Sequence, residues 1–351
     1  MSTSQPCGAC LVGSVPLADS DEVFATAAKH LGEHLKRIPD GETGARTNWI
    51  QWQVEVFQAT EALELVQSPP DKYGTAKTFA KLREGFAIDD VSFASLGYAE
   101  AALESYARFV DARGRGIVPE HCRFQVSLPT PLAPMHLYIT PDLAGALEPI
   151  YEAAMLKEVD QIVSAIPHAD LAVQWDTAVE FGVLEGVFPT YLNNPQNDVD
   201  ARLARLGKYI PSDVELGFHL CYGDAGHQHF VEPTDTEKLV TTANNIAANL
   251  DRPLNWLHLP VPKDRHDPAY FEPLGNLQLH PITELYLGLV HFSDGETGTS
   301  QRIAAAQAVL ANFGIATECG FGHRPSDTVA PLMEIHAACA APLSVKLDTD
   351  N

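Results

Sequence analysis

Short apolar runs alternate with longer amphipathic segments along most of this chain. In the longer segments the apolar residues recur every three or four positions, which is typical of helices that pack against a sheet. The clearest of these segments cover residues 98–112, 143–166, 237–250 and 301–314, and we expect the last helix to end at Gly314 as its C-cap. Strands that alternate with helices favour an α/β fold with a parallel sheet.

The short apolar runs predict eight strands. They cover residues 10–15, 37–42, 123–128, 170–176, 214–221, 255–260, 285–292 and 315–320. Eight strands with intervening helices predict a single (β/α)8 TIM barrel that forms one domain over residues 1–351, with about eight peripheral residues at each end. We expect residues 43–121 to be mostly helical and to form an elaborated early crossover.

Charge and apolar content exclude several kinds of partner. The chain has 23 Lys and Arg against 46 Asp and Glu, a formal net charge of −23, so nucleic acids and anionic membrane surfaces are poor partners. There is no apolar stretch of about 18 residues, as a membrane-spanning helix requires, and no secretory signal at the start. We therefore expect a cytoplasmic protein whose six cysteines are thiols or metal ligands. The oligomeric state stays open, and a homo-oligomer is compatible with the sequence.

The stretch FHLCYGD at 218–224 carries a histidine and a cysteine two positions apart. On a strand His219 and Cys221 project from the same face, so they are either half of a zinc site or two buried core residues. In a barrel, the carboxyl ends of all strands meet at one mouth, where functional groups lie. Polar and sulfur-containing residues occur at these predicted ends, namely Ser14, Glu42, Asp176, His219, Cys221, His258, His291 and Cys319.

Five segments occur in an order that resembles a known family. VGSVPL, DGETGAR, VQWDTAVEF, HLCYGD and ECGFGHR resemble the catalytic domain of cobalamin-independent methionine synthase, from about residue 10 to about residue 340. The chain looks closer to the shorter single-barrel relatives of that enzyme, such as epoxyalkane:coenzyme M transferase, within the uroporphyrinogen-decarboxylase-like superfamily. The resemblance implies that His219, Cys221 and Cys319 bind zinc. It also implies that Asp176 holds the amino group of a thiol substrate, with Ser14 and Glu42 nearby.

Two segments depart from the family pattern. The family has a fourth zinc ligand, a glutamate, on the strand after the His-x-Cys pair, but here that strand reads NWLHLPVP. Either His258 substitutes for the glutamate, or the metal keeps three protein ligands and an open position. As a further alternative, His258 is a hydrogen-bonded core residue or supports a metal ligand without binding the metal itself. The family's acid histidine corresponds to VHFSDGE, in which His291 lies about two residues early. Methyl transfer from a folate is therefore not implied.

The expected chemistry follows from zinc and a thiol. Zinc lowers the pKa of a coordinated thiol, and the resulting thiolate attacks an electrophile. His291 or His258 would supply a proton, and Asp176 and Glu42 would hold a cationic or hydroxyl-bearing part of the substrate. We expect Ser14 and His258 to belong to the substrate-binding residues as well. We thus expect a zinc-dependent transferase that moves an alkyl or methyl group from a small electrophilic substrate to a small thiol. A carbon–sulfur lyase running this chemistry in reverse, a metal-free decarboxylase-like barrel and a non-catalytic zinc- or ligand-binding barrel are the alternatives.

Other residues are assigned more weakly. Arg46 and Arg324 are candidates for binding a substrate carboxylate or sulfonate. The Cys7 and Cys10 pair is expected at the end of the barrel away from the mouth, without a function. His229 and the neighbouring His227 are expected in a solvated loop.

Overall fold

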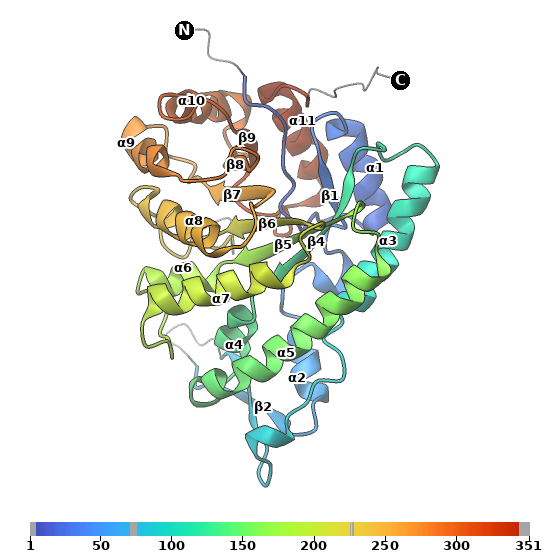
Figure 1. Cartoon of the computed structure of the whole chain (residues 1–351), viewed down its shortest axis with the longest axis vertical. Helices are drawn as coiled ribbons and strands as arrows, with labels where there is room; N and C mark the ends of the chain where they lie inside the picture. Colours follow the sequence, from blue (N-terminus) through green and yellow to red (C-terminus); the bar gives the residue numbers. More distant parts are fainter. Residues whose placement is uncertain (1–4, 71–75, 225, 227, 344–351) are drawn as a thin grey trace.

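The computed structural model describes residues 5–70, 76–224, 226 and 228–343. Seven strands form one curled sheet in the order β1-β4-β5-β6-β7-β8-β9, and all neighbouring strands pair in parallel (Figure 1). The strands are β1 Arg37–Pro39, β4 Arg123–Pro129, β5 Leu171–Thr177, β6 Glu215–Leu220, β7 Trp256–Pro260, β8 Glu284–Val290 and β9 Gly314–Thr317. The α/β class and seven of the eight predicted strands are therefore confirmed.

The predicted first strand, at 10–15, is not a regular strand. Ala9 forms isolated parallel bridges both to Leu35, just before β1, and to Ile315 of β9, so this segment contacts both edges of the sheet. The carbonyl of Val12, however, accepts hydrogen bonds from the side chains of Gln125 and Gln174, at 2.8 and 2.6 Å. Side chains thus replace part of the backbone hydrogen bonding here, and the segment lies between the edge strands β1 and β9 without continuous strand pairing.

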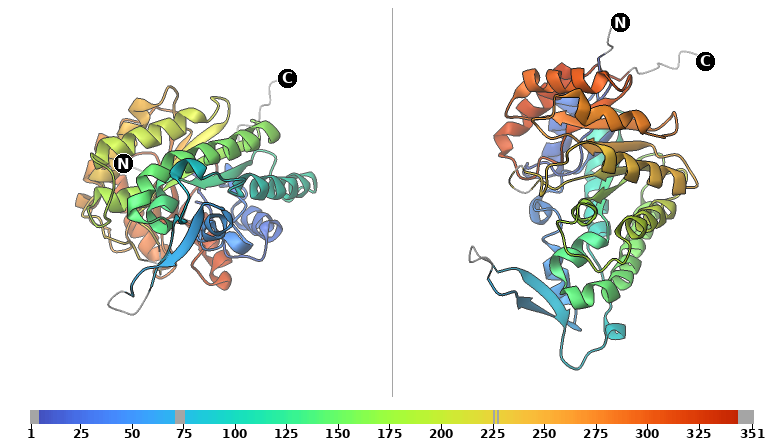
Figure 2. Two further views of the ribbon diagram at one scale, coloured as in Figure 1. Left: turned by 90° about the horizontal axis from the view of Figure 1, so that it is seen from below. Right: turned by 90° about the vertical axis from the view of Figure 1, so that its left-hand side faces the viewer.

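Helices lie around the curled sheet and extend below it in the view of Figure 1 (Figures 1 and 2). They are α1 Ser20–Leu31, α2 Gln53–Ala59, α3 Tyr98–Gly114, α4 Leu132–Tyr138, α5 Pro141–Ala165, α6 Val179–Leu184, α7 Pro195–Tyr209, α8 Glu237–Asn249, α9 Pro268–Phe271, α10 Gly295–Gln307 and α11 Val329–Cys339. The predictions for α3, α5 and α8 are confirmed to within a few residues. None of the helices in the described part of the chain has the length and apolar character needed to cross a membrane.

The predicted end of α10 at Gly314 is wrong. The helix begins at Gly295 and ends at Gln307, and Gly314 is instead the first residue of β9. A Cβ atom at Gly314 would lie 2.5 Å from the ring of Tyr286 on the paired strand β8. The glycine is thus required for close packing of the two strands rather than for ending the helix.

The excursion over residues 43–121 is less helical than predicted. It contains α2 and α3, but also an antiparallel hairpin of β2 Leu63–Gln67 and β3 Thr78–Leu82. Figure 1 shows the hairpin at the lower end of the molecule, apart from the main sheet and next to α2 and α4. The two segments, LELVQ and TFAKL, are mostly half-buried and do not alternate strictly between apolar and polar residues, and they are identified as strands by their antiparallel pairing from Leu63 opposite Leu82 to Gln67 opposite Thr78.

Candidate metal centre

Three polar side chains stand level with one another on neighbouring strands. Asp176 of β5 pairs in register with His219 of β6, and His219 pairs in register with His258 of β7. Side chains in register on parallel strands project to the same face, so these residues reach the interior of the curled sheet at one level. All three lie near the carboxyl ends of their strands, as the sequence predicts.

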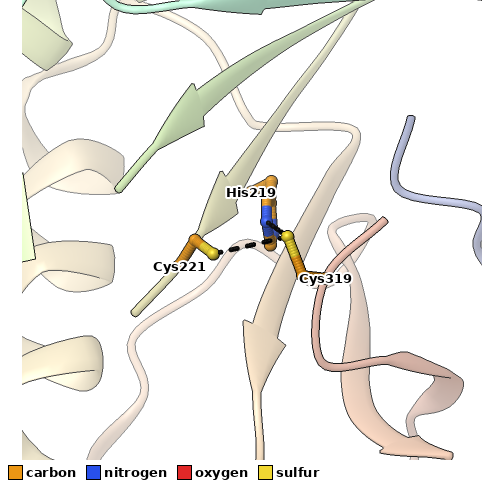
Figure 3. A group of neighbouring side chains, drawn as sticks. All are labelled: His219, Cys221 and Cys319. Atoms are coloured by element: carbon orange, nitrogen blue, oxygen red, sulfur yellow. Dashed lines mark hydrogen bonds between the residues drawn. The ribbon is translucent and has the colours of Figure 1, made fainter. Parts of the chain in front are cut away.

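His219, Cys221 and Cys319 form a compact group (Figure 3). Cys221 immediately follows β6, whereas Cys319 lies in the loop after β9. The Sγ atom of Cys319 lies 3.6 Å from Nε2 of His219 and 3.6 Å from Sγ of Cys221. All three potential ligand atoms lie within 4.8 Å of one another. The structure thus brings together side chains that are about a hundred residues apart in the sequence.

The two distances from Sγ of Cys319 to the other potential ligand atoms fit a tetrahedral metal site. Zinc binds sulfur at about 2.3 Å and imidazole nitrogen at about 2.0–2.1 Å, so two ligand atoms of a tetrahedral site lie about 3.6–3.8 Å apart. The two distances that involve Cys319 match this range. Two thiolates and one imidazole are a typical donor set for zinc. The residues present therefore fit the metal that the sequence predicts.

Glycines and a serine position the Cys319 loop. The backbone N–H of Phe321 donates to the carbonyl of Ser14 at 2.7 Å, and the N–H of Gly322 donates to Oγ of Ser14 at 3.2 Å. A Cβ atom at Gly320 would lie 2.3 Å from Oγ of Ser14, so only glycine allows this approach. Ser14 therefore fixes the loop that carries Cys319.

Local polar groups act differently on the two thiols. The backbone N–H of Gly223 donates a hydrogen bond to Sγ of Cys221 at 3.2 Å. The neighbouring Cys221 thiol and burial raise the pKa of Cys319 well above its ordinary value. A metal cation reverses this balance, because it binds the thiolate and displaces the proton.

The group lines a cavity of about 90 Å³ at the carboxyl end of the sheet. The predicted substrate residues Ser14, Glu42 and Asp176 line the same cavity. Burial raises the pKa of Glu42 to about 7, and burial together with the charge of Glu42 raises the pKa of Asp176 well above its ordinary value. Two carboxyl groups that each disfavour the other's charge favour a cationic or hydrogen-bonding ligand between them.

Two predicted site residues do not line this cavity. His258 is fully buried beside His219. His291 lies in an adjoining hollow of about 940 Å³, which shares Asp224 with the cavity. Its Nε2 is 2.9 Å from the carbonyl of Val261, and its Nδ1 is 3.4 Å from a carboxylate oxygen of Glu318. His291 thus faces the adjoining hollow and not the cavity that Glu42 and Asp176 line.

The weaker assignments also have defined places. Arg46 pairs with Asp40, and Arg324 pairs with Glu318 in the adjoining hollow. The imidazole of His229 also lines that hollow, with Nδ1 3.1 Å from Glu232, whereas His227 lies outside the described residues.

The cysteine pair near the amino terminus lies away from the cavity. Cys10 is buried among interior residues such as Trp256, and Cys7 is exposed. Neither residue lines the cavity that contains the His219 group.

Comparison with solved structures supports the fold. One similar structure is described as a putative vitamin-B12 independent methionine synthase from Listeria monocytogenes, with a TM-score of 0.57 and 15% identity over 96% of this chain and 99% of that chain. Another is a methyltransferase from Methanosarcina mazei, with a TM-score of 0.52 and 11% identity over 96% of this chain and 94% of that chain. No family model and no curated protein matches the chain. At these identities the similarity shows the α/β fold.

Four polar or aromatic residues that the sequence did not single out also line the cavity. They are Thr47, Trp49, Asp224 and His323. Asp224 and His323 lie inside the motifs HLCYGD and ECGFGHR, which is a signal that could have found them. Trp49 has no such signal, because it reaches the cavity through a left-handed backbone conformation with φ of 52°.

Proposed function

We propose that this chain is a zinc-dependent transferase that binds a small thiol and moves an alkyl or methyl group to its sulfur. The observation that carries the proposal is the close grouping of His219, Cys221 and Cys319, with potential ligand atoms within 4.8 Å of one another, at a cavity that Asp176 and Glu42 also line. The similar structures described as a methionine synthase and a methyltransferase support a reaction of this class.

The proposal includes a place in a fold family. We infer that residues 10–15 occupy the eighth strand position of a (β/α)8 barrel and that the chain forms one domain. The bridges of Ala9 to both sheet edges support the eighth position. The chain would then belong to the superfamily of cobalamin-independent methionine synthase, among cytoplasmic single-barrel members such as epoxyalkane:coenzyme M transferase.

Separate groups of residues would bind the metal and the thiol substrate. His219, Cys221 and Cys319 would hold zinc, which makes a bound thiol acidic enough to be a thiolate at neutral pH. Asp176 and Glu42 would hold the polar part of the thiol substrate inside the small cavity, and thereby orient its sulfur.

The adjoining hollow would receive the electrophile. A sulfur–carbon bond would form as the bond from carbon to the leaving group breaks, and the leaving group would take the proton that the thiol released on binding, passed on through Nδ1 of His291. Asp224 lines both spaces, so the two substrates would meet beside it. A carbon–sulfur lyase would use the same residues in the opposite direction, and a non-catalytic barrel would use the metal ligands alone.

Metal analysis tests the first part of the proposal. We expect about one zinc per purified chain, and loss of most of it in Cys221→Ser and Cys319→Ser. Cys339→Ser is the matched control, because Cys339 is also buried but lies on α11 and does not line the cavity. Zinc that stays in both site variants, or is absent from the wild type, would contradict the proposed centre.

Zinc-edge X-ray absorption tests the second part. L-Homocysteine and 2-mercaptoethanesulfonate serve as thiol probes for the zinc-loaded protein. We expect one of them to add a sulfur scatterer at about 2.3 Å. A spectrum that neither thiol changes would favour the non-catalytic zinc-binding alternative.

A further inference from the structure

His258 connects the proposed metal ligand His219 to the backbone of a third segment. Its side chain is fully buried, and its Nδ1 lies 2.6 Å from Nδ1 of His219. Its Nε2 lies 2.9 Å from the backbone carbonyl of Thr317, the last residue of β9. Both nitrogens of His258 are therefore engaged, and both contacts are short enough to be hydrogen bonds.

These contacts fix where the protons lie. A carbonyl oxygen can only accept, so Nε2 of His258 carries a proton and donates it to Thr317. Because His258 is buried and neutral, its Nδ1 then has a lone pair and accepts. Nδ1 of His219 must consequently donate, which leaves Nε2 of His219 without a proton. That Nε2 is the atom 3.6 Å from Sγ of Cys319.

We propose that His258 is a positioning residue that holds His219 in the tautomer whose Nε2 can bind metal. This inference rests on the proposed function, since it concerns the same centre. A ligating histidine commonly donates its other N–H to a partner that fixes ring and tautomer. Here the partner is a second imidazole, anchored in turn by Thr317.

A consequence concerns the fourth coordination position. The strand next to His219 uses its in-register residue, His258, to orient a ligand. Within the described part of the chain, no fourth His, Cys, Asp or Glu joins the group of His219, Cys221 and Cys319. A zinc ion held by these three residues would therefore have a fourth position free for a substrate sulfur.

Zinc affinity of His258 variants tests the role. Competition with a chromophoric chelator measures the affinity. We expect His258→Phe, which removes the acceptor, to bind zinc about 10–100-fold more weakly than the wild type. We expect His258→Asn to stay near the wild type, because its Oδ1 can accept from His219. His34→Phe is the control, since His34 is a buried histidine that precedes β1 at the opposite end of the sheet. Equal zinc affinity of folded His258→Phe and wild type would overturn the proposal.

A second measurement needs no variant at position 258 and no metal. Two-bond ¹⁵N–¹H correlation spectra of the metal-free wild type report the tautomer of each histidine, with His219 assigned from a His219→Gln sample. We expect the proton of His219 on Nδ1 and that of His258 on Nε2. A proton on Nε2 of His219 would overturn the positioning role even if His258→Phe does not fold. Failure of the wild type to bind zinc would instead overturn the proposed function.

Discussion

Single residues around β5 show how differently buried carboxyl groups are compensated. Asp176 accepts a hydrogen bond from Nε2 of Gln174 at 2.8 Å and faces the cavity. Glu180, four residues later, accepts from the hydroxyl of Thr130, but its second carboxylate oxygen has no hydrogen-bond partner. We interpret Asp176 as a group kept for a ligand and Glu180 as a buried acid whose ionisation costs stability.

Replacement of Asp176 tests its proposed contact with the substrate. In the zinc-loaded protein, we expect Asp176→Asn to weaken binding of L-homocysteine at least about tenfold, because a carboxylate partner for the ammonium group is lost. Binding of 2-mercaptoethanesulfonate, which has no ammonium group, should change much less. Titration calorimetry with both thiols measures the difference. Equal losses for the two thiols would point to a damaged cavity rather than to a specific contact.

Replacement of Glu180 tests the cost of its burial through pH. Burial raises the pKa of Glu180 from 4.5 to about 7, so between these pH values the folded chain binds more protons than the unfolded chain. Stability contributed by this group therefore falls as pH rises from about 4.5 to 7 and stays low above that. We therefore expect the free energy of unfolding of Glu180→Gln, relative to that of the wild type, to increase between pH 5 and pH 8 by up to about 3 kcal/mol.

Urea unfolding of both proteins at the two pH values measures this gain. Glu100→Gln, on the exposed face of α3, is the control and should show no comparable change with pH. The explanation fails if the difference between Glu180→Gln and wild type is the same at pH 5 as at pH 8.

At the scale of elements, sequence patterns predict regularly paired strands better than segments that side chains hold in place. Seven strands follow from apolar runs because each is buried on both faces of a parallel sheet. The hairpin of β2 and β3 was missed since its strands are short and half-exposed. The segment at 10–15 was assigned as a strand because its apolar run does not reveal that Gln125 and Gln174 bind its carbonyl.

The same limit applies to the metal centre. His219, Cys221 and Cys319 could be found because strand ends converge in this fold and the motif order is specific. The roles of His258 and His291 depend on the direction in which each imidazole ring points from its backbone position. Whether a ring faces the cavity or a backbone carbonyl is decided by packing, which the spacing of residues does not encode.

Gln174 offers a test of how the segment around Val12 is held. It donates to the carbonyl of Val12 and to Asp176, and its Oε1 accepts from the indole N–H of Trp256 at 3.1 Å. We expect Gln174→Leu to lower the free energy of unfolding by about 2–4 kcal/mol, because it leaves buried polar atoms without partners. Gln196→Leu, at a more exposed position on α7, should change it by less than about 0.5 kcal/mol. Urea unfolding measures both, and equal effects would contradict the argument.

For the molecule as a whole, the two ends of the curled sheet have different tasks. The carboxyl end carries the proposed metal centre, whereas the amino end is closed by a buried charge network around Arg37 of β1. The guanidinium of Arg37 pairs with Glu215 of β6 at 2.5 Å and with Glu284 of β8 at 3.0 Å. It also lies 4.1 Å above the ring of Trp256 of β7. One side chain thus connects strands from opposite parts of the sheet.

Because the Arg37 network and the proposed metal centre lie at opposite ends of the sheet, mutations in the network should change stability without changing zinc content. Arg37→Met leaves two largely buried carboxylates without their shared partner, so we expect it to lower the free energy of unfolding by about 3 kcal/mol. The triple variant Arg37→Met, Glu215→Gln, Glu284→Gln should recover most of this loss, because no buried carboxylate then lacks a partner, and the cations that lose one, Arg123 and Lys36, are partly exposed to water. Zinc content should stay at the wild-type level in both proteins, since the network lies at the end of the sheet opposite the metal centre. Loss of zinc from folded Arg37→Met, or a triple variant no more stable than the single one, would show that the two ends are not independent.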